Sequence, residues 1–150
     1  MSNEKVRSEL LVAPVLLELK RQHPTAIGLF SGVELSVDPS AGLTGTCDFL
    51  LSLTPEQYFV KAPIVTLVEA KKEDLSPGMG QCVAEMVAAR IFNERARNSI
   101  ETVYGVVTSG LSWRFMGLTG PTLTIDMKDY PIGELDLILG ILVSMTTATG

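Results

Sequence analysis

The stretch IVTLVEAK, residues 64–71, is the sequence feature that most restricts the possible folds of this chain. Its first five residues are apolar or β-branched, a pattern typical of a strand that is buried on both faces. Such a strand needs covering layers, so we expect a sheet with helices packed against it. The strand then runs directly into Glu69 and Lys71. Because an unpaired buried charge is costly, these two side chains need a partner or a function.

Turn-forming residues divide the rest of the chain into further helices and strands. The first predicted helix covers residues 4–21, and Pro14 either kinks it or lies in the first turn of a second segment. A second helix runs from Ser76, its expected cap, to about Glu94, with Pro77 at the first helical position. The remaining predictions are strands at 27–37, 45–53, 63–71, 102–108, 112–118 and 122–127, and a helix at 133–147. The order predicts an α/β fold in one domain, residues 1–150, with a mixed central sheet.

Composition excludes several classes of function. The net charge of −5 argues against a non-specific nucleic-acid coat, although basic residues gathered on one face would still serve an enzyme. One histidine, His23, excludes a His-rich zinc site and argues against a Ser-His-Asp triad. Cys47 and Cys82 lie far apart and are expected to be reduced core residues. We find no signal peptide and no bilayer-spanning stretch, and expect a soluble, cytoplasmic protein.

Asp48 lies inside the strand predicted before residues 64–71. Side chains alternate along a strand, so Glu69 and Lys71 share one face. If the two strands are neighbours, Asp48 and Glu69 meet at one point, where Mg²⁺ or Mn²⁺ would relieve their repulsion. Lys71 would lie beside the ion, where it would activate or orient a water and stabilise charge at phosphorus. The alternative is a structural ion pair of Lys71 with Asp48 or Glu69.

Asp48, a gap of 20 residues, and then Glu69-Ala70-Lys71, set in an α-β-β-β-α-β order, resemble the PD-(D/E)XK nuclease superfamily. The resemblance covers about residues 5–108 and implies a restriction-endonuclease-like core, with two further strands and a helix in residues 109–150. It implies that Asp48, Glu69 and the backbone carbonyl of Ala70 bind Mg²⁺ or Mn²⁺, and that Lys71 assists water attack on a phosphodiester. Cys47 replaces the proline that usually precedes the aspartate, at a position that is not a metal ligand in the family.

The resemblance suggests further site residues on the two helices. Many members carry a glutamate on the first helix, and Glu9 is favoured over Glu18, which would face nearly the opposite way. Members often carry a polar residue on the helix after the lysine, where Gln81 fits; it is either a site residue or a surface residue. Glu85, one turn later, is interpreted as a surface residue. Lys72 points to the opposite face of its strand from Lys71 and is expected to take no part.

Two nucleotide-binding motifs are rejected. GMGQCV, residues 78–83, lacks the third glycine of a dinucleotide fingerprint, and no P-loop sequence occurs. Trp113 and Phe115 are expected in a core or a subunit face, not in base stacking. The last helix is apolar enough to cover the sheet or a two-fold partner, so a homo-oligomer is expected. The sequence therefore predicts a metal-dependent nuclease, with DNA the favoured substrate; the alternative is a nuclease-fold interaction module with little or no catalysis.

Overall fold

A computed structural model of the protein describes residues 11–23, 27–38, 40, 43–54, 64–71, 74–97 and 100–147. Within these residues, three α-helices accompany one open, mixed sheet of seven strands, which makes the fold α/β. The elements in chain order are α2 (Ala13–Gln22), β1 (Gly28–Asp38), β2 (Leu43–Ser52), β3 (Ile64–Ala70), α3 (Ser76–Arg95), β4 (Thr102–Thr108), β5 (Ser112–Thr119), β6 (Thr122–Ile125), β7 (Tyr130–Pro131), the 3-10 turn η3 (Ile132–Glu134) and α4 (Leu135–Thr147).

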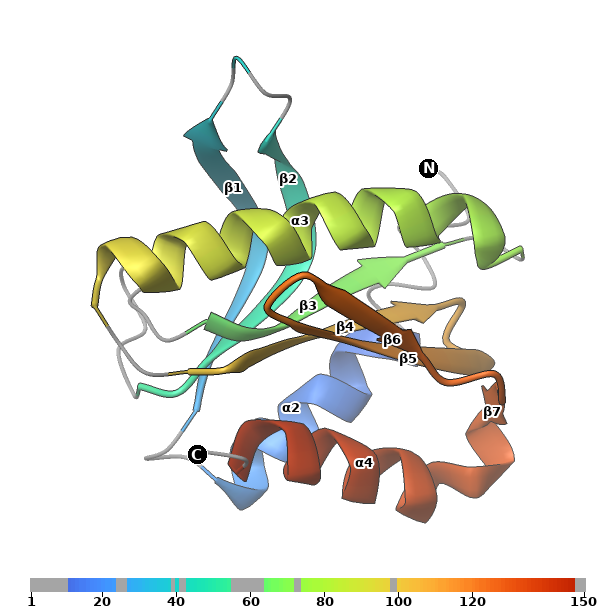
Figure 1. Ribbon diagram of the computed structural model, residues 1–150. Helices are drawn as coiled ribbons and strands as arrows, with labels where there is room; N and C mark the ends of the chain where they lie inside the picture. The colour runs from blue at the N-terminus through green and yellow to red at the C-terminus, as the bar shows by residue number, and fades with distance from the viewer. Residues whose placement is uncertain are drawn as a thin grey trace.

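The helices lie on opposite sides of the sheet. Figure 1 shows α3 crossing one face, with α2 and α4 on the other. Each side has its own apolar core: Leu16, Trp113 and Ile138 belong to the core on the α2 and α4 side. Met86 and Val107 belong to the core beneath α3. The central strands are thus covered on both faces, as the apolar run at residues 64–68 predicts.

The sheet follows the order β1-β2-β3-β4-β5-β6, with β7 paired to β5. Only β3 and β4 run parallel among the described pairs, and α3 forms the crossover between them. The other pairs are antiparallel. α3 follows β3 in the chain and so begins at the edge where β3 ends; it returns the chain to the opposite edge, where β4 starts parallel to β3. The edge where β3 ends collects the charged residues that follow the apolar run.

Two irregularities lie between β1 and β2: the register shifts between Ser36 and Asp38, and the pairing is interrupted at Gly32 without a shift. Gly32 has a φ of +61°, a left-handed value that favours glycine, and it interrupts pairing between Ser31–Phe49 and Val33–Cys47. The alternation of side chains between the two faces of β2 changes at the same point. Cys47 and Leu50 both pack into the core beneath α3, although residues three apart on a regular strand point to opposite faces. Asp48 therefore sits where the regular pleat is broken.

The helix ends differ from the sequence predictions in one respect. Ser76 is the first residue of α3 and not its cap; Leu75 holds the capping position, and the Ser76 amide donates to Asp74 Oδ1 at 3.0 Å. Pro14 lies in the first turn of α2, as expected if it marks the start of a second helical segment and does not kink a single helix. The predicted helix residues 4–10 lie outside the described residues.

The C-terminal strands also differ slightly. The strand predicted at 122–127 ends at Ile125, because Asp126 turns the chain: its carboxylate accepts hydrogen bonds from Lys128 N and Tyr130 Oη. This turn returns the chain to β5 as β7, a strand that the sequence analysis did not predict. Helix α4 then covers the sheet with Ile138, Leu142 and Met145.

Candidate functional site

Asp48 lies at the end of the ladder between β2 and β3. The last regular pair is Phe49 with Val68, and continuing this register by one residue places Asp48 opposite Glu69. Asp48 Oδ2 accepts a hydrogen bond from the Ala70 amide at 2.8 Å. The Asp48 side chain thereby satisfies a backbone amide of β3 at the point where the backbone hydrogen bonds between β2 and β3 stop. The strands that carry the two carboxylates are thus neighbours, and the negative charge of Asp48 acts on Glu69.

Glu69 points beneath α3 and meets Glu85. Glu69 has no exposed surface, and Glu85 is 6% exposed. One carboxylate oxygen of each, together with Cys47 Sγ, forms a group in which all three atoms lie within 4.8 Å of one another. The interpretation of Glu85 as a surface residue is therefore wrong. It occupies the buried stripe of α3 with Cys82, Met86 and Ala89, a spacing of three, four and seven residues.

The two carboxylates are unfavourable as a pair of anions. None of their four oxygens has a hydrogen-bond partner among the described residues. At an effective dielectric constant of about 20, two unit charges 4.8 Å apart repel by about 3.5 kcal/mol. Burial, together with the facing Glu85, raises the pKa of Glu69 from 4.5 to about 10. Burial is also the main reason that the pKa of Glu85 is raised. Either protons or a cation must neutralise this pair.

Lys71 follows directly after β3 and lies over the first turns of α3. Its amide donates to the carbonyl oxygen of Thr108 at 2.7 Å, which fixes the backbone at the sheet edge. Its Nζ donates to Gln81 Oε1 at 3.1 Å. A Cβ added to Gly78 would lie 2.8 Å from Lys71 Cγ and 2.9 Å from its Cε. The lysine stem therefore packs on a helix position that only glycine leaves open.

Gln81 links the lysine to the buried carboxylates. It is exposed and accepts a hydrogen bond from Lys71 Nζ, and its side chain offsets part of the rise in the pKa of Glu85 one turn along α3. Of the residues that the sequence analysis singled out, the structure brings together Asp48, Glu69, Ala70, Lys71 and Gln81 at the edge where β3 ends and α3 begins.

Only one of the two first-helix glutamates, Glu18, lies in the described part of the chain, and it is not brought to this point. Glu9 lies outside the described residues, as does Lys72. Glu18 lies on α2, which packs on the face of the sheet away from α3, and it pairs with Arg21 at 2.6 Å on an exposed surface. The structure therefore provides no role for Glu18 at the site.

Two residues were missed by sequence reasoning. Glu85 was placed on the surface, and Cys47 was treated as a core residue beside the aspartate. Both cysteines are buried and neither forms a disulfide, as expected. Burial, together with Glu85 and Glu69, raises the pKa of the Cys47 thiol well above its usual range. Glu85 lies in an otherwise apolar stripe of α3, but apolar residues occupy other faces of the helix too, so this signal alone does not place it inward.

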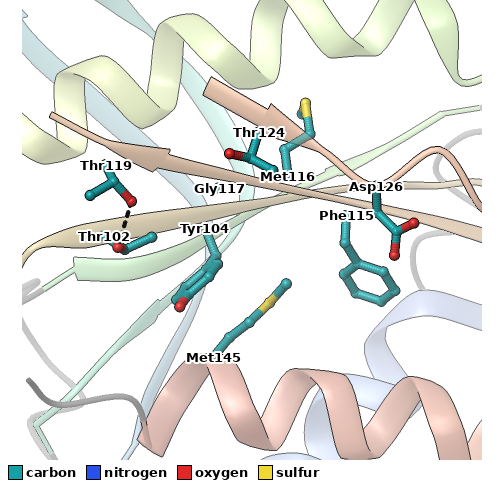
Figure 2. Close-up of a pocket in the computed structure, with 9 residues that line it drawn as sticks. All are labelled: Thr102, Tyr104, Phe115, Met116, Gly117, Thr119, Thr124, Asp126 and Met145. Carbon is teal, nitrogen blue, oxygen red and sulfur yellow. Dashed lines mark hydrogen bonds between the residues drawn. The ribbon is translucent and has the colours of Figure 1, made fainter. Parts of the chain in front are cut away.

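A separate cavity lies on the other side of the sheet. It has a volume of about 480 Å³ and is bounded by β4, β5, β6 and the end of α4. Figure 2 shows Tyr104, Phe115 and Met145 lining one side of it, and the Thr102 hydroxyl bonded to that of Thr119. None of the described residues that line it belongs to the predicted site. Trp113 and Phe115 are buried in the core, as predicted.

No protein-family model, curated protein or solved structure matches the chain. Among the described helices, none is both long enough and apolar enough to cross a membrane.

Proposed function

We propose that the protein is a divalent-metal-dependent phosphodiester hydrolase that acts on nucleic acid, with DNA as the favoured substrate. The observation that carries the proposal is the buried carboxylate Glu69, which has no hydrogen-bond partner within the described part of the chain and lies beside Asp48 and Lys71. The sequence pattern at these residues resembles the PD-(D/E)XK superfamily. The order α2-β1-β2-β3-α3-β4 supports the restriction-endonuclease-like core that this resemblance implies.

The residues present fit a divalent cation. Asp48 has one carboxylate oxygen bonded to Ala70 N, and the buried oxygens of Glu69 have no hydrogen-bond donor among the described residues. Asp48, Glu69 and the carbonyl of Ala70 are oxygen ligands of the kind that Mg²⁺ and Mn²⁺ prefer. When bound, such an ion would polarise a phosphoryl oxygen and lower the pKa of a water.

Lys71 is suited to stabilise charge on the phosphoryl group. An ammonium group has three donor positions, and Gln81 takes one of them. No other described residue is seen to accept from Nζ, which leaves the remaining donors for a phosphoryl oxygen or the attacking water. Gln81 holds Nζ at the open edge of the site, and Gly78 allows the stem to approach α3. In this role Gln81 positions the lysine and does not act on substrate itself.

The proposal is tested by cleavage of labelled single- and double-stranded DNA with Mg²⁺ or Mn²⁺. Lys71→Met is the most informative variant, because it retains an aliphatic stem over Gly78 and loses the ammonium group. We expect it and Asp48→Asn to lower the cleavage rate at least 100-fold. Lys128→Ala is a matched control, since Lys128 lies on an exposed segment beside Glu134 and Tyr130. Cleavage that survives in Lys71→Met and Asp48→Asn would contradict the assignment.

A second candidate is a nuclease-fold interaction module with little or no catalysis. The complete burial of Glu69 and the net charge of −5 favour it, since neither assists approach of a polyanion. It predicts no metal-dependent cleavage by the wild-type protein under any of these conditions. Cleavage abolished by Lys71→Met would exclude it.

A further inference from the structure

Three metal-ligating side chains converge beneath α3 from three different elements. Cys47 comes from β2, Glu69 from β3 and Glu85 from α3. A ligand atom of each lies within 4.8 Å of the other two, and no residue of the three is more than 6% exposed. Asp48 is not a member of this group. The donor set is therefore different from the one proposed for hydrolysis, although Glu69 belongs to both.

The carboxylates independently indicate a missing positive charge. Both are more than nine-tenths buried, and all four of their oxygens lack a hydrogen-bond partner among the described residues. A proton shared between the carboxyls would satisfy one oxygen of each and leave the other two without a donor. A cation would neutralise both groups at once. The Cys47 Sγ, which donates to the Phe49 carbonyl at 2.8 Å, stands where it would complete the ligand set.

We propose that Cys47, Glu69 and Glu85 form a binding site for a divalent transition-metal ion, for which Zn²⁺ is the best match. A sulfur ligand selects against Mg²⁺, which prefers oxygen ligands in octahedral geometry. Zn²⁺ accepts sulfur and carboxylate ligands together, with bonds of about 2.0–2.3 Å. On binding, the thiol proton leaves to solvent and the sulfur becomes a thiolate ligand. The site shares only Glu69 with the proposed hydrolytic site, and the proposal holds whether or not the protein is a hydrolase.

The site would join α3 to two strands of the sheet. Cys47 occupies the position next to Asp48 where the pleat is broken, and this irregularity brings its side chain to the α3 side. An ion bound there would hold the Glu69 carboxylate from the α3 side. Asp48 lies at the edge of the same pair of strands. The ion would therefore stabilise the fold and hold a carboxylate of the proposed hydrolytic site in place.

Cobalt titration tests the sulfur ligand directly. Co²⁺ replaces Zn²⁺ in such sites, and a thiolate ligand adds a near-ultraviolet charge-transfer band that oxygen ligands do not produce. We expect this band in the wild-type protein, its loss in Cys47→Ser, and its retention in Cys82→Ser, a matched control for a second buried thiol beneath α3. We also expect it in Asp48→Asn, which removes the proposed hydrolytic ligand and leaves this site intact.

Each other outcome is decisive. Cobalt binding without the charge-transfer band would overturn the site and leave the proposed hydrolase standing, because the ion would then bind through oxygens alone. A band lost in Cys82→Ser but kept in Cys47→Ser, or no cobalt binding, would also overturn it. If Cys47→Ser fails to fold, X-ray absorption of the zinc-loaded wild-type protein decides: one sulfur at about 2.3 Å supports the site, and a shell of light atoms alone refutes it. DNA cleavage, measured separately, decides the proposed function.

Discussion

Glu69 of β3 and Glu85 of α3 each hold a carboxylate oxygen within 4.8 Å of the other, inside the core between the sheet and the helix. The charged end of the buried strand β3 thus faces a second buried carboxyl group. The cost of this pair is tolerable only if the carboxyls are protonated or if a cation lies between them. The metal-free protein and the metal-bound protein should therefore respond to pH in different ways.

Stability of the metal-free protein should fall as the pH rises. The pKa of Glu69 is about 10 in the folded state and close to 4.5 when unfolded, so the native state binds the extra proton between these values. The stabilisation is complete below about pH 4.5 and is lost as the pH rises toward 10, with a slope of at most about 1.4 kcal/mol per pH unit for each such proton. Urea unfolding between pH 5 and pH 9 in the presence of a chelator measures this slope.

The control for this titration is a neutral side chain of the same shape. Glu69→Gln should flatten the pH dependence and be more stable than wild type at the alkaline end. Glu94→Gln, an exposed position on the same helix, should leave the slope unchanged. An equal slope in Glu69→Gln and in wild type would mean that another group carries the titration.

Two glycines of α3 should respond differently to alanine. A Cβ at Gly78 would meet Lys71 Cγ, Lys71 Cε and Val107 Cγ1 at 2.8 to 3.0 Å, whereas a Cβ at Gly80 meets nothing within 4 Å. Gly80→Ala should raise the free energy of unfolding by about 0.5–1 kcal/mol, from helix propensity alone. Gly78→Ala should show no such gain and should lower the DNA cleavage rate, because Lys71 is displaced from Gln81. Chemical denaturation and a cleavage assay check both, and equal behaviour of the two variants would count against the packing of Lys71 on α3.

Asn93 should be important for stability although it lies far from the proposed chemistry. Its side chain accepts from Ile64 N at 2.7 Å and donates to Ile64 O at 2.8 Å, so it completes the hydrogen bonds at the buried start of β3. Asn93→Leu leaves both backbone groups without a partner and should cost about 2–4 kcal/mol. Glu94→Ala, at the next and exposed position, should cost less than about 0.5 kcal/mol. A mild effect of Asn93→Leu on urea unfolding would show that water replaces the side chain.

Much of this fold could be predicted from the sequence because its signals are local. The strand at 102–108 follows from a run of β-branched residues and is found at those bounds. The sheet neighbours of β3 follow from hairpin-type turns and one helical crossover. The prediction that Ser76 caps α3 was wrong. The Asp74 side chain, two residues upstream, accepts a hydrogen bond from the Ser76 amide, and the serine is the first residue of the helix.

Which side chains reach the buried part of the site could not be predicted in the same way. Glu85 lies in a helix with apolar residues on several faces, so its period alone does not say which stripe is inward. Cys47 reaches the α3 side because Gly32 on the opposite strand has a positive φ, and strict alternation places the thiol on the other face. Such an irregularity leaves no periodic signal in β2. Tertiary packing of α3 on the sheet therefore determines which carboxylates meet.

The most direct test of the account is a thermal melt of the protein with increasing Mn²⁺ at neutral pH. At a concentration about 100 times its dissociation constant, a bound ion stabilises the native state by about 2.7 kcal/mol, which raises the melting temperature by several degrees. We predict this rise in wild type and in Glu94→Gln, a smaller rise in Asp48→Asn and none in Glu69→Gln. No shift in wild type, or an undiminished shift in Glu69→Gln, would contradict a metal site built on Glu69.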